Sequence, residues 1–168
     1  MKKSILLILF LLLALAASSV FAEDQVGAVG DICDCGDMAV RLTTDPKVTT
    51  IINGRNTRNG TFVTLRIELT YISDTYWKAL DKGSFSLINI TDGARKEYPL
   101  DYITTMVASE INQTDTILED LEFPEIRNYM LIFDVDKDLH TGWSLHFTPM
   151  ERGTTAAYCD KEMPLPKF

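Results

Sequence analysis

The sequence predicts an all-β domain, an antiparallel β-sandwich of about seven strands that follows a cleaved signal peptide. Two long segments, Thr61–Ser73 and Tyr129–Asp136, alternate apolar and polar residues with the period of two that indicates a half-buried strand. Turn dipeptides such as Asn53–Gly54 and Asp92–Gly93 recur at the spacing of an antiparallel sheet. Little of the remaining sequence favours a helix, so the pattern argues against an α/β fold.

The segment Thr61–Ser73 has the clearest alternation and therefore fixes which way its strand faces. Its apolar side carries Val63, Leu65, Ile67, Leu69 and Tyr71. Its other side carries Phe62, Thr64, Arg66, Glu68 and Thr70. We expect the first side to be buried and the second to face water, because a slip of one residue would bury Arg66 and Glu68.

Shorter segments complete the expected sheets. They are Met38–Leu42, Val48–Ile52, Ser84–Ile90, Lys96–Leu100 and Trp143–Phe147. Trp77 and Trp143 are expected to fill the core, because tryptophan buries a large apolar area. The turn dipeptides at its two ends predict that Asn53–Gly60 is a loop.

The segment Asp101–Asp120 is expected to be a loop with one turn of helix. Three apolar residues in it have helical spacing, namely Ile103, Val107 and Ile111. Threonines at three positions favour a strand instead, namely Thr104, Thr105 and Thr116.

The first 22 residues have the organisation of a secretory signal peptide. Lys2 and Lys3 precede a nearly unbroken apolar run, and small residues then predict cleavage between Ala22 and Glu23. An uncleaved anchor helix is the alternative, for which the apolar run is short. We expect a secreted or cell-envelope protein with no membrane span after cleavage. Its parts would be residues 23–29 as a flexible lead-in, 30–150 as the sandwich and 151–168 as a C-terminal tail.

The charge balance of the mature chain is strongly acidic. The full sequence has 16 Lys and Arg against 24 Asp and Glu. Removal of Lys2 and Lys3 with the signal peptide leaves 14 bases against 24 acids, a net charge of −10. Nucleic acids and anionic membranes need a basic surface, so we expect neither as a partner.

Three cysteines in an exported chain predict one disulfide and one remaining thiol. We expect Cys159 to pair with Cys33 or Cys35, which would tie the tail to the start of the domain. A Cys33–Cys35 bridge and a thiolate metal site stay open as alternatives, although the CxC spacing differs from the CxxC of structural zinc sites.

Few residues suggest further chemistry. Asp134, Asp136 and Asp138 are candidate calcium ligands, because their spacing places three carboxylates on one strand face. An acidic, water-facing strand surface is the favoured explanation, because the glycine and the later acid of calcium-binding loops are missing. We commit to no metal, cofactor or catalytic residue. His146 is expected to be exposed opposite Trp143. Glycan acceptor patterns begin at Asn59, Asn89 and Asn112.

Several stretches resemble the telokin-like extracellular domains of unknown function, which occur in exported proteins and lipoproteins of bacteria and archaea. The matching stretches are Gly60, Phe62–Ser73, Phe85–Tyr98 and Leu131–Lys137. The resemblance implies an immunoglobulin-like sandwich without a known activity. The chain departs from the family pattern at Tyr71, where asparagine is usual, and in Cys33–Asp34–Cys35 and Asp101–Asp120.

We therefore expect a non-enzymatic exported domain that contacts a protein or a cell-envelope component. A metal-binding module that uses the acidic clusters or the cysteines is the alternative. A hydrolase would need a site that the sequence does not reveal, since the H-E-x-x-H, G-x-S-x-G and phosphate-loop motifs are missing from it.

Overall fold

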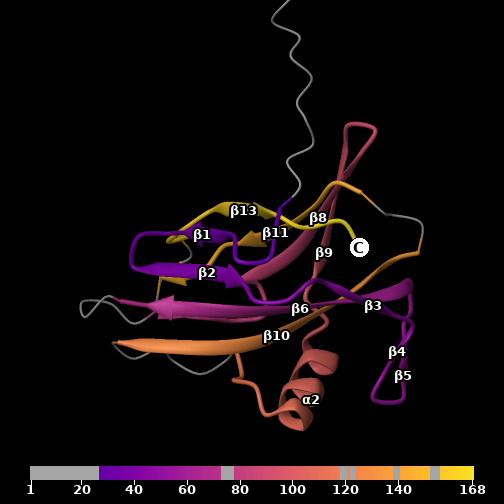
Figure 1. Cartoon of the computed structure of the whole chain (residues 1–168), viewed down its shortest axis with the longest axis horizontal. Coiled ribbons are helices and arrows are strands. Elements are labelled where there is room, and N and C mark those ends of the chain that lie inside the picture. The colour runs from indigo at the N-terminus through magenta and orange to yellow at the C-terminus, as the bar shows by residue number, and fades with distance from the viewer. Residues whose placement is uncertain (1–26, 73–77, 118–120, 122–123, 138–140, 152–155) are drawn as a thin grey trace, which may run out of the picture.

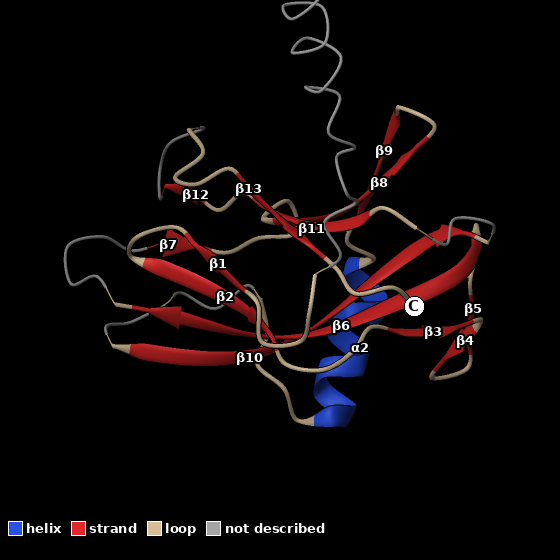
Figure 2. Ribbon diagram, turned by 45° about the horizontal axis from the view of Figure 1, so that its top comes forward, coloured by secondary structure: helices blue, strands red, loops and turns tan. Residues whose placement is uncertain are grey.

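The computed structural model describes residues 27–72, 78–117, 121, 124–137, 141–151 and 156–168. These residues form a mostly β structure, with antiparallel sheets and one short helix, α2 (Tyr102–Asn112) (Figures 1 and 2). Within them, no helix combines the length and apolar character needed to span a membrane. The predicted signal peptide, its cleavage site at Ala22 and Glu23, and Trp77 lie outside the described residues.

The larger sheet has five strands in the order β1-β2-β6-β10, with β3 also paired to β6. The strands are β1 (Ile32–Asp34), β2 (Met38–Leu42), β3 (Lys47–Thr49), β6 (Gly60–Tyr71) and β10 (Glu125–Asp136). The two long strands β6 and β10 are antiparallel partners along their whole length, with Gly60 opposite Asp136 and Tyr71 opposite Glu125. The two segments with the clearest alternation are thus neighbouring strands, with β10 at the end of this strand order.

The second sheet has four strands in the order β13-β11-β8-β9. The strands are β8 (Phe85–Thr91), β9 (Ala94–Pro99), β11 (Trp143–Phe147) and β13 (Lys161–Pro164). Two short ladders join β4 (Ile51–Ile52) to β5 (Arg55–Asn56), and β7 (Lys78–Ala79) to β12 (Met150–Glu151). The segment Asn53–Gly60, predicted as a loop, therefore contributes β5 to a small hairpin.

One apolar core receives side chains from both sheets. The predicted inward face of β6 is buried in it, and Leu65 and Leu69 are fully covered. Phe133 of β10 and Leu145 of β11 contribute from the two different sheets. Trp143 is buried in this core, as the sequence predicted.

A second, smaller apolar cluster lies on the opposite face of the five-stranded sheet. It consists of Phe62, Met130, Ile132 and Ala108, with Ile52 packed against it. Figure 1 shows α2 on this face, away from β8, β11 and β13. The prediction that Phe62 lies on a water-facing surface was wrong, because α2 and the β4–β5 hairpin cover this part of β6.

The helix α2 also corrects the prediction of a loop over Asp101–Asp120. Its first turn is capped by Asp101, whose Oδ1 accepts a hydrogen bond from the Thr104 backbone N–H at 3.1 Å. Its end is marked by Gln113 in the left-handed conformation, with φ of 53°. The helical spacing of Ile103, Val107 and Ile111 was therefore the informative signal. Thr104 and Thr105 fit the helix because both are on its buried face.

The C-terminal segment is part of the fold and not only a tail. Strand β13 pairs with β11 and places Met163 opposite Leu145 in the core. The backbone at Gly27 in turn lies so close to the Pro164 carbonyl that a Cβ there would be only 1.8 Å from its oxygen. The two ends of the described chain thus pack together at one edge of the four-stranded sheet.

Candidate binding site

A cavity of about 450 Å³ opens where the β4–β5 hairpin, the end of β9 and the start of α2 meet. Its wall carries three cationic side chains, Arg55, Arg58 and Lys82. Tyr98, Pro99, Leu100, Tyr102 and Ile103 supply the apolar part of the wall, and Asp101 and Asp134 supply carboxylates. We call this cavity the basic pocket.

The loop that carries Arg58 is held in place by Asp134 of β10. Its Oδ1 accepts hydrogen bonds from the Thr57 hydroxyl at 2.5 Å and from the Asn59 backbone N–H at 3.1 Å. Its Oδ2 accepts one from the Arg58 backbone N–H at 2.7 Å. A carboxylate that receives three hydrogen bonds orders this loop and so positions the Arg58 side chain at the pocket.

An apolar ridge begins at the mouth of the pocket and runs along α2. Ile103, Val107 and Ile111 occupy successive turns of one helix face and remain 57%, 38% and 62% exposed. The buried face of the helix is instead made of small or polar residues, namely Thr104, Thr105, Ala108 and Ser109. We call the exposed residues the α2 stripe, and it inverts the usual arrangement of an amphipathic helix.

Small residues on the inner face explain how α2 can sit in this orientation. Ala108 is fully buried against the cluster of Phe62 and Ile132. The hydroxyl of Thr105 accepts a hydrogen bond from the Ile132 backbone N–H at 3.1 Å, so the helix is bonded directly to β10. The polar inner face is satisfied by the sheet in this way, while the bulky apolar residues are left outside.

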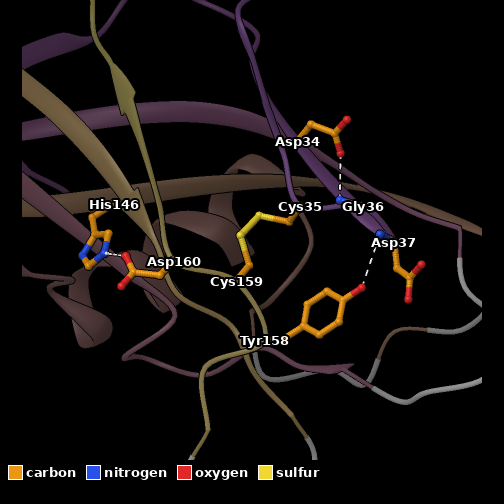
Figure 3. Close-up of a disulfide and its surroundings, with 8 residues drawn as sticks. All are labelled: Asp34, Cys35, Gly36, Asp37, His146, Tyr158, Cys159 and Asp160. Atoms are coloured by element: carbon orange, nitrogen blue, oxygen red, sulfur yellow. Dashed lines mark hydrogen bonds and ion pairs between the residues drawn. A yellow bond between two sulfur atoms is a disulfide. The ribbon is translucent and has the colours of Figure 1, made fainter.

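The cysteines lie at the opposite end of the molecule from the pocket. Cys35 and Cys159 form a disulfide that joins the β1–β2 turn to the segment before β13 (Figure 3). Cys33 is free and buried, and burial raises the pKa of its thiol. The structure thus selects one of the two pairings left open by the sequence and removes the Cys33–Cys35 alternative.

Next to the disulfide-bearing segment, His146 is held between acidic groups. Its Nε2 lies 2.8 Å from Asp160 Oδ1 (Figure 3), and its Nδ1 lies 3.3 Å from the Ser86 hydroxyl and 3.6 Å from Glu97 Oε1. Its side chain is only 14% exposed, so the prediction of an exposed His146 was wrong. Its ring nitrogens face the polar side chains of Asp160, Ser86 and Glu97.

This cluster has the residue types of a Ser-His-Asp triad but a different arrangement. The Ser86 hydroxyl donates to Glu97 Oε1 at 2.5 Å, and this bond is the main cause that lowers the pKa of Glu97. Ser86 is itself buried, and none of the three residues lines the basic pocket. A nucleophile needs its hydroxyl directed at its base in an open site, and here the proton is directed at a carboxylate.

Two of the three candidate calcium ligands, Asp134 and Asp136, are engaged in different contacts. Asp134 binds the loop before β6, whereas Asp136 accepts hydrogen bonds from Lys96 and Tyr98, and Lys96 lowers the pKa of Asp136. Asp138 lies outside the described residues. Across the described ranges, no three His, Cys, Asp or Glu side chains form a group that could hold a metal ion.

The three glycan acceptor patterns occupy different environments. Asn59 and Asn112 are exposed, whereas Asn89 is buried and its amide donates to the Thr141 carbonyl at 2.5 Å. Modification of Asn89 would require that strand to open, so only the other two positions are accessible in the folded domain.

Comparisons with known proteins identify a fold but no family. No protein-family model matches the chain, and no curated protein matches it. A crystal structure of a conserved hypothetical protein from Bacillus anthracis matches with 13% identity and a TM-score of 0.50, over 82% of this chain and 94% of that one. The structure of a "putative lipoprotein" from Staphylococcus aureus matches with 11% identity and a TM-score of 0.46, over 80% and 92%. The first likeness concerns the fold alone, and membership of the telokin-like family stays a prediction.

The disulfide gives evidence about the cellular compartment in which the protein resides. Disulfides persist in oxidising surroundings outside the cytoplasm, and Cys35–Cys159 bridges a sequence separation of 124 residues. This observation agrees with the N-terminal sequence in indicating an exported β domain.

Sequence reasoning missed the basic pocket and the direction of the α2 stripe. The pocket draws its cations from two separate segments of the chain, and no local motif connects Arg55 and Arg58 with Lys82. The stripe did leave a signal, since the spacing of Ile103, Val107 and Ile111 is helical. The small residues between them, Thr104, Thr105 and Ala108, were the indication that the bulky face would not be the buried one.

Proposed function

We propose that this protein is an exported, non-enzymatic domain that binds a protein partner through the α2 stripe. The observation that carries this proposal is the inverted orientation of α2, which buries Thr105 and Ala108 and exposes Ile103, Val107 and Ile111. A helix that only stabilised the sheet would direct its bulky apolar residues inward. A contiguous apolar ridge on the surface instead marks an interaction site.

The charges around the α2 stripe indicate which charged residues the partner would carry. Arg66 lies at its C-terminal end, where its Nη2 donates to Asn112 Oδ1 at 3.2 Å, and the basic pocket adjoins Ile103 at its N-terminal end. The chain as a whole carries a net charge of −8. We infer a partner whose apolar side chains are flanked by acidic residues. A second copy fits less well, because two acidic chains repel each other.

The proposal that the domain is not an enzyme rests on the environment of Ser86. Its hydroxyl donates to Glu97, so this arrangement of Ser86, His146 and Asp160 is directed away from nucleophilic use. We also infer that the two antiparallel sheets form an immunoglobulin-like sandwich, because both send side chains into one core. A fold of this kind hosts many unrelated binding functions, so the α2 stripe and not the fold supports the function.

Site-specific photo-cross-linking in the producing cell tests the proposal. Benzoylphenylalanine replaces Val107 in one variant and Ile32 in the control, since Ile32 is an equally apolar exposed residue on β1 (63% exposed). We expect a discrete protein adduct from position 107 and none from position 32. Equal adducts from both positions, an adduct of the chain with itself, or no adduct at position 107 would contradict a protein partner at the stripe.

A further inference from the structure

We propose that the basic pocket binds a small organic anion, a molecule that joins a carboxylate or phosphate group to an apolar body. This site goes beyond the proposed function, because it lies in the cavity beside the α2 stripe and does not require the partner protein. The inference is drawn from the charges, the hydrogen bonds and the wall of the cavity.

None of the three cations of the pocket forms an ion pair with a carboxylate among the described residues. The ion pairs among the described residues involve other bases, namely Arg41, Arg95, Lys96, Arg127 and His146. Arg55, Arg58 and Lys82 thus gather around one cavity without an ion pair in the described part of the chain. In a chain of net charge −8, a cavity lined by three such cations is a local exception to the overall charge.

The two carboxylates of the pocket offset part of this positive charge, and three cations against Asp101 and Asp134 leave its wall a formal charge of +1. Both oxygens of Asp134 accept hydrogen bonds from the Thr57–Asn59 loop. Asp101 caps α2 through the Thr104 backbone N–H. The guanidinium groups and the Lys82 ammonium therefore keep donors for a ligand that brings its own negative charge, and guanidinium binds carboxylate and phosphate oxygens well.

The rest of the wall is apolar and aromatic. Tyr98 comes from the end of β9 and Leu100 directly follows that strand. Tyr102 and Ile103 come from the first turn of α2. A bare inorganic ion would leave this surface unused, whereas a ligand with a ring or an alkyl group would cover it. The volume of about 450 Å³ is in the range of cavities that hold small organic molecules.

Titration of the full-length chain, expressed in an exporting host, with three small probes tests the assignment. The probes are phenyl phosphate, inorganic phosphate and benzyl alcohol. Binding of each probe is monitored through the backbone amide NMR shifts of the protein. We expect saturable shifts at Leu100, Tyr102 and Ile103 with phenyl phosphate. We expect at least tenfold weaker binding of inorganic phosphate, which lacks the apolar body, and of benzyl alcohol, which lacks the charge. Benzoate in place of phenyl phosphate shows whether a carboxylate serves as well.

Two matched variants test whether the probe binds in the basic pocket. Lys82→Gln removes a pocket cation, and Lys161→Gln removes an exposed cation on β13 with the same change of charge. We expect Lys82→Gln to weaken phenyl phosphate binding at least fivefold and Lys161→Gln to leave it within twofold. The proposal is overturned if no probe gives saturable shifts at the pocket, or if the two variants weaken binding equally. Ile111→Gln should leave probe binding unchanged, which separates this test from that of the α2 stripe.

Discussion

The inverted orientation of α2 leads to a prediction about the stability of the domain, which can be tested without the partner protein. The triple substitution Ile103→Gln, Val107→Gln and Ile111→Gln is expected to leave the domain as stable as before, although it removes three bulky apolar side chains. The reason is that Ile103 and Ile111 are more than half exposed in the folded domain, at 57% and 62%, and Val107 is 38% exposed. The matched change on the opposite face, Ala108→Gln, is expected to be strongly destabilising, because Ala108 is fully buried.

The expected magnitudes follow from these exposures. Substitution of an exposed side chain usually changes the free energy of unfolding by no more than about 0.5 kcal/mol. Glutamine also favours helix slightly more than isoleucine or valine, by a few tenths of a kcal/mol at each position. At position 108 a longer side chain would overpack the cluster at about 1–3 kcal/mol, and its buried amide would cost about 1–3 kcal/mol more.

Urea unfolding followed by circular dichroism measures both variants. A constant slope of free energy against urea concentration ensures that the midpoints report stability. The triple variant should unfold within about 1 kcal/mol of the parent, and Ala108→Gln should lose about 2–6 kcal/mol. If the triple variant instead loses more than about 2 kcal/mol, the α2 stripe is part of the core and the reasoning from its exposure is refuted.

Three further predictions concern the cysteines and Glu97. Cys35→Ser opens a loop with a sequence separation of 124 residues and should lower the free energy of unfolding by up to about 5 kcal/mol, whereas Cys33→Ser keeps the disulfide and should lower it far less. Ellman's reagent should find one thiol in the denatured, unreduced protein and none in the native one, because Cys33 is buried; two or more thiols after denaturation would contradict the pairing. The hydrogen bond from Ser86 holds the pKa of Glu97 below its unfolded value of about 4.3, so its stabilisation is present above about pH 4.3 and is lost as the pH falls through the folded pKa. Glu97→Gln should therefore flatten the fall of stability between about pH 5 and pH 3, and an unchanged slope would contradict this origin.

The strands could be predicted from the sequence because alternation reports directly on one-sided burial. Met38–Leu42 and Trp143–Phe147 are strands β2 and β11 at the predicted bounds, and β6 differs from its prediction only at the ends. The alternation misled at Phe62, because a residue on the opposite face of a strand is exposed only if nothing covers that face. The short, charged strand β13 has no such pattern, and only its pairing with β11 defines it.

The candidate site was less predictable, since it depends on contacts between distant segments. Arg55, Arg58 and Lys82 meet only because the β4–β5 hairpin and the loop before β8 reach the same cavity. The environment of His146 has the same origin, as Asp160 and Glu97 come from other strands or loops and cover its side chain. The disulfide was predictable in part. The cysteine count predicted one bond, but the choice of Cys35 over Cys33 as the partner of Cys159 needed the geometry of β1.

The affinity of the cross-linked partner for matched variants tests the central claim most directly. Ile111 and Ile32 are almost equally exposed, but only Ile111 lies in the α2 stripe. Burial of the remaining exposed part of one isoleucine is worth about 1–2 kcal/mol, or about 5- to 30-fold in the dissociation constant. A partner that binds the stripe should lose this affinity with Ile111→Gln and keep it with Ile32→Gln. Equal affinities of the two variants would contradict the assignment of α2 as the binding surface.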